Sequence, residues 1–201
     1  MQKLIAGIKE FRRRLTPEAR ARFKQLAYAQ TPDCLFVACS DSRVVPNLFA
    51  STDPGDLFVV RNVGNLVPTL DSAPERAAVE FSLMALGVRD IVVCGHSNCG
   101  AMRAALDRSL APDAPHLQGW LDQVRPSISR LDLHGPGADL PLHDRLSQLN
   151  VLQQLDHLRS FPEVQARIAA GTLAVHGWWF DIGRAEVQVY QEESGRFEPI
   201  C

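Results

Sequence analysis

The sequence has no long hydrophobic run. No stretch approaches the roughly 18 to 20 consecutive apolar residues that a membrane-spanning helix needs. Charged residues also interrupt the first ten positions before the apolar core of a signal peptide could form. We therefore expect no membrane partner and a cytoplasmic location.

The sequence also lacks a strong excess of charge and a dense set of cysteines. It has 21 Lys and Arg against 23 Asp and Glu, a formal net charge of −2, so it has no overall positive field that would attract nucleic acid. Its five cysteines are odd in number and too sparse for the disulfide framework of a small secreted domain. We expect a small-molecule substrate, no nucleic-acid partner, and reduced thiols that are available to a metal.

Phosphate-binding glycine loops are missing as well. No G-x-G-x-x-G follows the first apolar run, and no G-x-x-x-x-G-K-[ST] occurs in the chain. A nucleotide-binding α/β domain is an alternative that the order of strands and helices would suit, but it has no motif to cradle phosphate.

Unbroken apolar runs are present at 34–39, 57–60 and 91–94, and they are typical of strands that are buried on both faces. The segment 74–86, between the last two runs, has the pattern of a buried helix. Strand, helix and strand in this order predict parallel pairing with a right-handed crossover. We therefore predict an α/β fold with a central, mostly parallel β-sheet flanked by helices.

The length and the 46% hydrophobic content suit a single domain over residues 1–201. An amphipathic helix over 2–15 and a second helix from Pro17 toward Gln30 form an N-terminal helical arm. Residues 185–190 alternate between apolar and polar, which predicts a C-terminal edge strand with one wet face. The expected parts are the arm at 1–30, an α/β core at 34–110, a helical part at 115–170 and C-terminal strands at 172–190.

Two short clusters follow buried strands and lie 57 residues apart, Cys39-Ser40-Asp41-Ser42-Arg43 and His96-Ser97-Asn98-Cys99-Gly100. Loops at the carboxyl ends of parallel strands converge at one crevice, so the clusters should meet there. Alone, the first fragment is more often a core cysteine beside a polar turn than a metal-binding motif. Together, two thiolates and an imidazole are three Zn²⁺ ligands, and a fourth open position is typical of a catalytic metal.

Four motifs in this chain resemble those of the β-class carbonic anhydrases in order and spacing. They are 39–43, Arg61-Asn62-Val63-Gly64-Asn65, 94–100 and His176-Gly177-Trp178. The resemblance runs from the N-terminal helices to about Phe180. It implies reversible hydration of carbon dioxide to bicarbonate and a proton, by attack of zinc-bound hydroxide on CO2. It also implies one Zn²⁺ per chain, held by Cys39, His96 and Cys99.

The resemblance gives roles to Asp41 and Arg43. Asp41 would accept the proton of the zinc-bound hydroxide, and Arg43 would hold that carboxylate in place. In the family's closed state, Asp41 instead becomes a conditional fourth zinc ligand. The family's inhibitory bicarbonate site uses a Trp where this chain has Phe36, together with positions that are here Val44 and Arg61. Because the Trp is missing, we predict an Asp41–Arg43 pair and an open zinc site at neutral pH.

The resemblance also indicates substrate-binding residues and an assembly. Gln30 matches an active-site glutamine, Phe58, Val63 and Phe81 match apolar pocket positions, and Gly100 belongs to the same set. Ordinary core packing would explain the apolar members equally well. Enzymes of this class assemble through their N-terminal arms, so a homodimer or tetramer is expected.

Two alternatives share the metal ligands. One is a binding or regulatory protein that has lost turnover, which the intact Asp41 and Arg43 argue against. The other is a purely structural zinc site, for which Asp41 is the only near candidate as fourth ligand. No residue distinguishes the physiological uses of the reaction.

Overall fold

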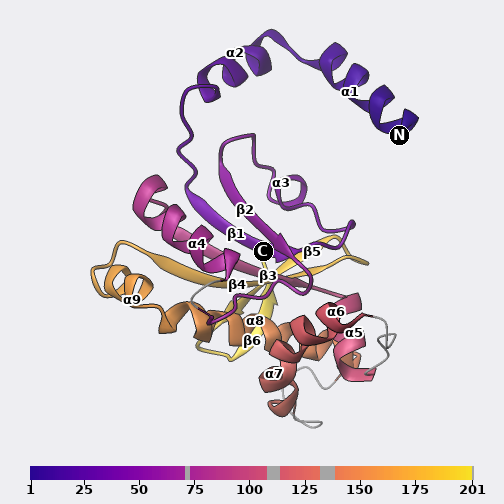
Figure 1. The fold of residues 1–201 in the computed structure, drawn as a ribbon, viewed down its shortest axis with the longest axis vertical. Coiled ribbons are helices and arrows are strands. Elements are labelled where there is room, and N and C mark those ends of the chain that lie inside the picture. Colours follow the sequence, from indigo (N-terminus) through magenta and orange to yellow (C-terminus); the bar gives the residue numbers. More distant parts are fainter. Residues whose placement is uncertain (71–72, 108–113, 132–138, 201) are drawn as a thin grey trace. The chain divides into compact units, whose positions relative to one another are not determined.

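The computed structural model of the chain describes residues 1–70, 73–107, 114–131 and 139–200. The contacts divide the chain into two units, residues 1–31 and residues 32–201. Figure 1 shows the helices and strands of both units. Within the described residues, no helix is both long enough and apolar enough to cross a membrane.

The N-terminal unit consists of two helices, α1 (Gln2–Arg14) and α2 (Pro17–Leu26). Thr16 caps α2, since its side chain accepts a hydrogen bond from the Ala19 N–H at 3.2 Å. The rings of Phe11 and Phe23 meet edge to face at 6.1 Å and join the helices. Both helices were predicted, and α2 ends at Leu26, before it reaches Gln30.

A six-stranded sheet forms the second unit, in the order β2-β1-β3-β4-β5-β6. The first four strands pair in parallel and the last two are antiparallel, so the predicted α/β fold with a mostly parallel sheet is confirmed. The strands are β1 (Cys34–Cys39), β2 (Leu57–Asn62), β3 (Asp90–His96), β4 (Ala174–Asp181), β5 (Glu186–Gln191) and β6 (Arg196–Pro199).

The C-terminal edge of this sheet is β6 and not β5, which corrects the interpretation of 185–190 as the edge strand. β5 pairs with β4 on one side and with β6 on the other. Gly195, at a φ of +66°, helps the chain reverse after β5, and the rings of Tyr190 and Phe197 then lie 5.4 Å apart. The alternating pattern indicates that one face of β5 is partly buried. It does not indicate whether another strand pairs with β5 at its outer edge.

The second unit has helices at the predicted segments 74–86 and 115–170, and a short helix, α3 (Pro46–Phe49), that was not predicted. The predicted helix over 74–86 is α4 (Pro74–Phe81) continued by one π-helical turn (Ser82–Leu86), although Phe81 and Met84 are exposed. The helical part at 115–170 contains no strand among its described residues. The other helices are α3 (Pro46–Phe49), α5 (Gly100–Asp107), α6 (Pro115–Leu121), a 3₁₀ turn (Asp122–Val124), α7 (Arg125–Ser129), α8 (Leu142–Ser160) and α9 (Pro162–Ala169).

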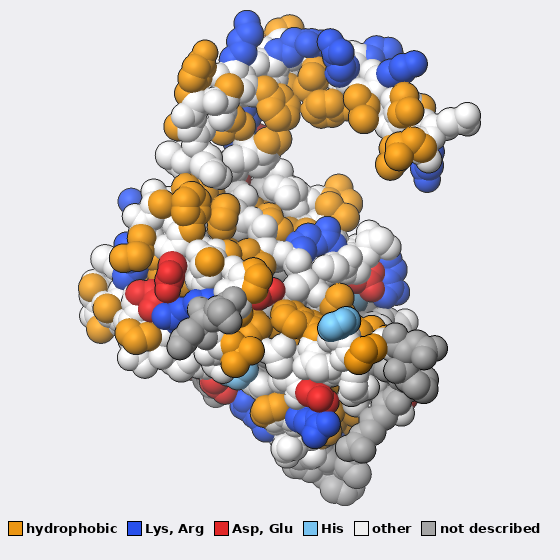
Figure 2. Space-filling model, in the orientation of Figure 1, with side chains coloured by type: hydrophobic (Ala, Val, Ile, Leu, Met, Phe, Trp, Pro, Cys, Tyr) orange, Lys and Arg blue, Asp and Glu red, His pale blue; other side chains and the backbone are white. Residues whose placement is uncertain are grey.

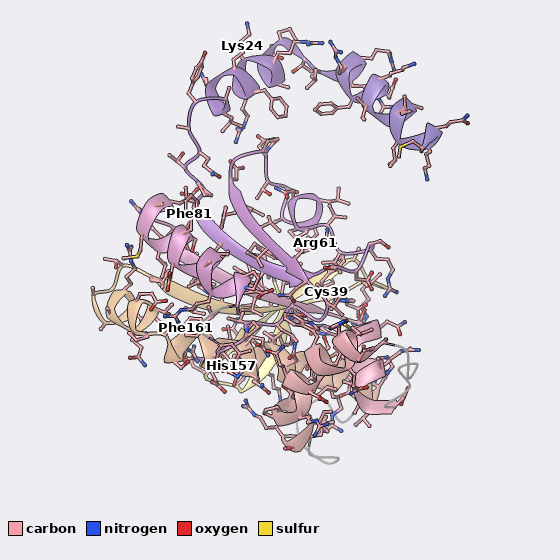
Figure 3. The ribbon with its side chains drawn as sticks, in the orientation of Figure 1. Lys24, Cys39, Arg61, Phe81, His157 and Phe161 are labelled. Carbon is pink, nitrogen blue, oxygen red and sulfur yellow. The ribbon has the colours of Figure 1, made fainter. Side chains whose placement is uncertain are left out.

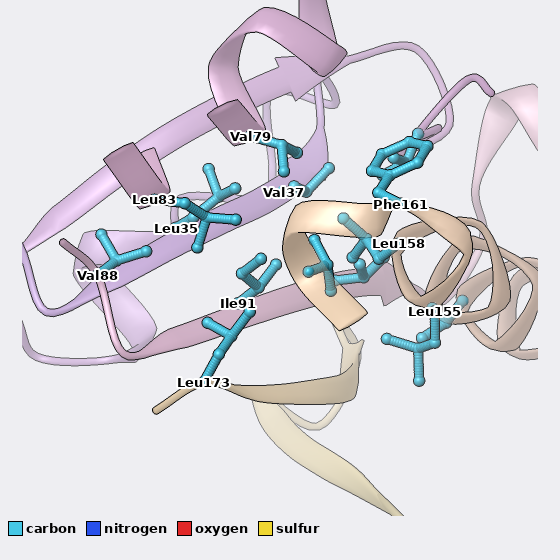
Figure 4. Close-up of a cluster of buried hydrophobic side chains, with 14 residues drawn as sticks. Leu35, Val37, Val79, Leu83, Val88, Ile91, Leu155, Leu158, Phe161 and Leu173 are labelled. Carbon is cyan, nitrogen blue, oxygen red and sulfur yellow. The ribbon is translucent and has the colours of Figure 1, made fainter. Parts of the chain in front are cut away.

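The main core lies where β1 and β3 pack against α4, α8 and α9 (Figure 4). On the other face of the sheet, Phe36, Ala38 and Phe180 belong to a second buried cluster. Gly95 lets α8 come close to β3, because a Cβ at this position would lie 2.8 Å from Val151 Cγ2. This close approach brings the first turns of α8 next to His96, at the carboxyl end of the strand.

Candidate metal centre

The three predicted metal ligands come together at the carboxyl edge of the sheet. Cys39 ends β1, His96 ends the neighbouring parallel strand β3, and Cys99 lies just before α5. All three residues are buried, and their ligand atoms lie within 4.8 Å of one another. Figure 3 shows Cys39 at the end of β1. Convergence of strand ends in a parallel sheet therefore builds the cluster as expected.

The two thiols interact directly. A hydrogen bond from the Cys99 thiol lowers the pKa of Cys39 below its usual range, aided by His96 and by the Gly64 N–H, whose nitrogen lies 3.4 Å from the sulfur. The same bond, together with burial, raises the pKa of Cys99. One thiolate is thus favoured even in the bare pair, and a divalent cation would favour the second.

The imidazole of His96 is oriented for coordination. Its Nδ1 lies 2.9 Å from the Ser97 carbonyl, while its Nε2 is buried and has no hydrogen-bond partner among the described residues. A buried ring nitrogen without a partner is costly unless something binds it. Two sulfurs and one such nitrogen form a donor set that fits Zn²⁺.

Asp41 lies beside these ligands and is held by Arg43. The Arg43 Nε and Nη2 donate to the two carboxylate oxygens of Asp41 at 2.9 and 2.7 Å, and the Arg43 backbone N–H donates at 3.0 Å. These bonds hold the pKa of Asp41 well below its usual range. Asp41 Oδ2 is 3.9 Å from His96 Nε2. The predicted pairing of Asp41 with Arg43 is therefore present.

Arg61 supports the same segment through its backbone. Its guanidinium donates to the Cys39 carbonyl at 3.1 and 3.0 Å and to the Asp41 carbonyl at 2.7 Å. The two other residues of the possible inhibitory site, Phe36 and Val44, are fully buried. The Phe36 ring packs against Trp178, with centroids 5.7 Å apart. Sequence analysis named Arg61 but did not foresee that it holds the segment carrying Cys39.

Ser147, on α8, is a supporting residue that sequence analysis missed. Its hydroxyl accepts a hydrogen bond from the His96 N–H at 3.2 Å and donates to the His96 carbonyl at 2.9 Å. The Trp179 indole N–H donates to the same hydroxyl at 3.2 Å. The one signal in the sequence was the small Gly95, which permits this approach of α8.

The substrate-binding candidates lie in three places. Val63 directly follows β2, and Gly100 begins α5, so both are at the metal end of the sheet. Phe58 lies four residues before the end of β2, about 13 Å back along the strand, where its ring is 5.7 Å from that of Phe81. Gln30 is exposed in the N-terminal unit, after the end of α2.

Comparisons with known proteins agree with this site. Residues 34–187 match the model of the carbonic anhydrase family. Over 203 residues the chain is 40% identical to a carbonic anhydrase of Pseudomonas aeruginosa, covering 100% of this chain and 92% of that protein.

Solved structures show the same likeness. The β-carbonic anhydrase CcaA is similar with a TM-score of 0.91 and 39% identity, covering 100% of this chain and 99% of that one. One of two tetrameric β-carbonic anhydrases of Sordaria macrospora has a TM-score of 0.75 and 32% identity, covering 94% and 92% of the two chains. With the converging ligands and the family match over most of its length, the chain belongs to the β-carbonic anhydrase family of enzymes.

Proposed function

We propose that this protein catalyses the zinc-dependent reversible hydration of CO2 to bicarbonate and a proton, with one Zn²⁺ held by Cys39, His96 and Cys99. The observation that carries the proposal is the buried cluster of these three ligand atoms beside the Asp41–Arg43 pair. A bound Zn²⁺ supplies Lewis acidity that makes water a nucleophile near neutral pH.

Asp41 and Arg43 are the proposed catalytic residues. Arg43 fixes the Asp41 carboxylate through three hydrogen bonds, next to His96 Nε2. Because the pKa of Asp41 is held low, the carboxylate stays ionised at neutral pH and acts as a hydrogen-bond acceptor. In this role it would orient the oxygen that attacks CO2 by accepting a hydrogen bond from the O–H group of that oxygen. An Asp41 freed from Arg43 could instead become a fourth metal ligand and close the site.

Substrate contacts are proposed for five residues. Val63 and Gly100 lie at the end of the sheet that carries the proposed metal site. Phe58 lies about 13 Å back along β2, with the Phe81 ring of α4 beside it, so we expect the two rings to line a pocket that a second copy completes. The exposed amide of Gln30 can donate a hydrogen bond to a substrate oxygen.

A homodimer or tetramer is proposed because α1 offers an apolar face. Figure 2 shows hydrophobic side chains along one side of the N-terminal helices and Lys and Arg along the other. Leu4, Ile5, Ile8 and Phe11 are all about half exposed or more, and relatives from Sordaria macrospora are described as tetrameric. Light scattering should show a smaller mass for Ile8→Glu than for the control Lys9→Glu. Equal masses would contradict assembly through α1.

A cytoplasmic location is proposed from the state of the thiols. Cys34, Cys39, Cys94 and Cys99 are free among the described residues, and the metal site needs two of them reduced. Reducing compartments keep such thiols available. Fractionation of cells that express the protein would check this.

Stopped-flow measurement of CO2 hydration by the zinc-loaded protein tests the function. We expect turnover in the wild type and a rate near background for Cys39→Ala, which removes a ligand. Cys94→Ala is a matched control, because Cys94 is buried in β3 but is outside the cluster. A wild-type rate no higher than that of Cys39→Ala would contradict the enzyme and favour a zinc-binding regulatory protein.

A further inference from the structure

The turn that joins two of the metal ligands contains a residue in an unusual conformation. Asn98 has a φ of +59°, in the left-handed region that is uncommon for residues other than glycine, although asparagine adopts it more often than most. Such a conformation persists where the surrounding contacts hold it in place. Because Asn98 directly precedes Cys99, the contacts that hold its backbone also determine where the Cys99 thiol points.

Three side chains from different parts of the chain hold Asn98. Its backbone N–H donates to Asp144 Oδ1 at 2.5 Å, and its carbonyl accepts from Arg43 Nη2 at 3.1 Å. Its side-chain oxygen accepts from Arg103 on α5. The same Arg43 nitrogen donates to Asp41 Oδ2 at 2.7 Å. The Asn98 peptide therefore connects the turn between the ligands with the Asp41–Arg43 pair.

Asp144 is the buried member of this set. It is 8% exposed, whereas Arg43 and Arg103 are exposed. It is the third residue of α8, the helix that also holds His96 through Ser147. A hydrogen bond from a backbone N–H to a buried carboxylate is charge-assisted and stronger than a neutral one. Arg43, Asn98 and Asp144 line one hollow of about 390 Å³, so the three groups converge.

We propose that Asp144 is a positioning residue of the metal centre. Its carboxylate holds Asn98 in the left-handed conformation, and this sets both the position of the Cys99 thiol and the carbonyl that receives Arg43. Among the described contacts, Asp144 bonds to no metal-ligand side chain and not to Asp41. The inference rests on the proposed function in one respect, that Cys39, His96 and Cys99 hold Zn²⁺.

The test compares Asp144→Ala and Asp144→Asn with Asp156→Ala. Asp156 is an exposed residue of the same helix that pairs only with Arg130 among the described contacts. Two quantities are measured in the full-length protein, the rate at which Zn²⁺ passes to an excess of chromophoric chelator and the visible absorption spectrum of the Co²⁺-substituted protein. Neither measurement depends on CO2 hydration.

We expect Asp144→Ala to lose Zn²⁺ about 10 to 100 times faster than the wild type, because removing a group that orients metal ligands usually lowers metal affinity by that factor and a weaker site releases its metal sooner. Its Co²⁺ spectrum should shift, because the Cys99 sulfur moves. Asp144→Asn should lose Zn²⁺ at a rate between those of the wild type and Asp144→Ala, since an amide oxygen accepts the same bond without the charge. Asp156→Ala should match the wild type.

Several results would overturn the proposal. One is Zn²⁺ release from Asp144→Ala at the rate of Asp156→Ala with an unchanged Co²⁺ spectrum, and another is Asp144→Asn as impaired as Asp144→Ala. If Asp144→Ala does not fold, Arg103→Met takes its place, because it removes the bond to the Asn98 side chain. It should release Zn²⁺ faster than Asp156→Ala, and an equal rate counts against the proposal. A wild type that holds no zinc overturns the proposed function as well, whereas one that holds zinc without hydrating CO2 overturns the proposed function alone.

Discussion

The two segments that carry the proposed metal ligands are held in different ways. After β1, residues 39–43 are held largely by their own motif, because Arg43 binds Asp41 two residues away, and Arg61 on the neighbouring strand adds its bonds. After β3, residues 96–99 are held mainly by groups on α8 and by Ile182, directly after β4, which lie 46 to 85 residues along the chain, while Arg43 and Arg103 also bond to Asn98. The segment after β1 is thus held mainly by contacts within a short motif, whereas the segment after β3 depends on how the distant helix α8 packs.

Gly95→Ala should lower stability and zinc retention the most, because it disturbs the packing that holds the segment after β3. The new Cβ would lie 2.8 Å from Val151 Cγ2 and 3.2 Å from the Ser147 carbonyl oxygen, so α8 must move away from β3. Such overpacking costs about 1–3 kcal/mol of unfolding free energy. The melting temperature and the amount of zinc that the protein retains should both fall.

Gly119→Ala is the matched control for that substitution, because a Cβ there meets nothing within 4 Å. A Gly95→Ala protein as stable and as rich in zinc as Gly119→Ala would show that the close approach of α8 is not required.

Ser147→Ala should have the next largest effect. It leaves the buried His96 N–H without its partner, which costs about 1–3 kcal/mol, and it frees the backbone that carries the imidazole. Denaturant unfolding and zinc affinity would be measured beside Ser160→Ala, which removes an exposed hydroxyl on the same helix. Equal values for the two variants would mean that α8 does not hold His96 through this hydroxyl.

Arg43→Met should have the smallest effect on stability. The pair lowers the pKa of Asp41, so its contribution is present above the ordinary carboxyl pKa of about 3.9 and is lost as pH falls toward the lowered value. Because Arg43 is 45% exposed, solvent screening limits the contribution to about 0.5–1 kcal/mol.

Urea unfolding at pH 7 and at pH 3 measures this difference. We expect the wild type to be more stable than Arg43→Met at pH 7 and the gap to narrow at pH 3. A gap that widens in acid would contradict the sign of the Asp41 shift. The rate of CO2 hydration should fall by about 10- to 100-fold even though the loss of stability is small, since Asp41 loses its orientation.

Much of this site was predictable, because the informative residues directly follow buried strands. Unbroken apolar runs identified β1 and β3, and the rule that parallel strand ends converge then brought Cys39, His96 and Cys99 together. The Asp41–Arg43 pair was predictable because its partners are two residues apart. β6 escaped prediction because Arg196–Pro199 is a short strand that depends on pairing with β5.

The sequence by itself determined which residues are the proposed metal ligands, that they follow two buried parallel strands, and the Asp41–Arg43 pair, since these follow from local residue patterns and short spacings. Only the tertiary structure decided that Arg61 holds the Cys39 and Asp41 carbonyls and that Asp144 and Ser147 hold the turn from His96 to Cys99. These bonds join residues that are 20 to 51 positions apart. These bonds form because α8 packs on the sheet and β2 pairs with β1, and no short stretch of sequence encodes either arrangement.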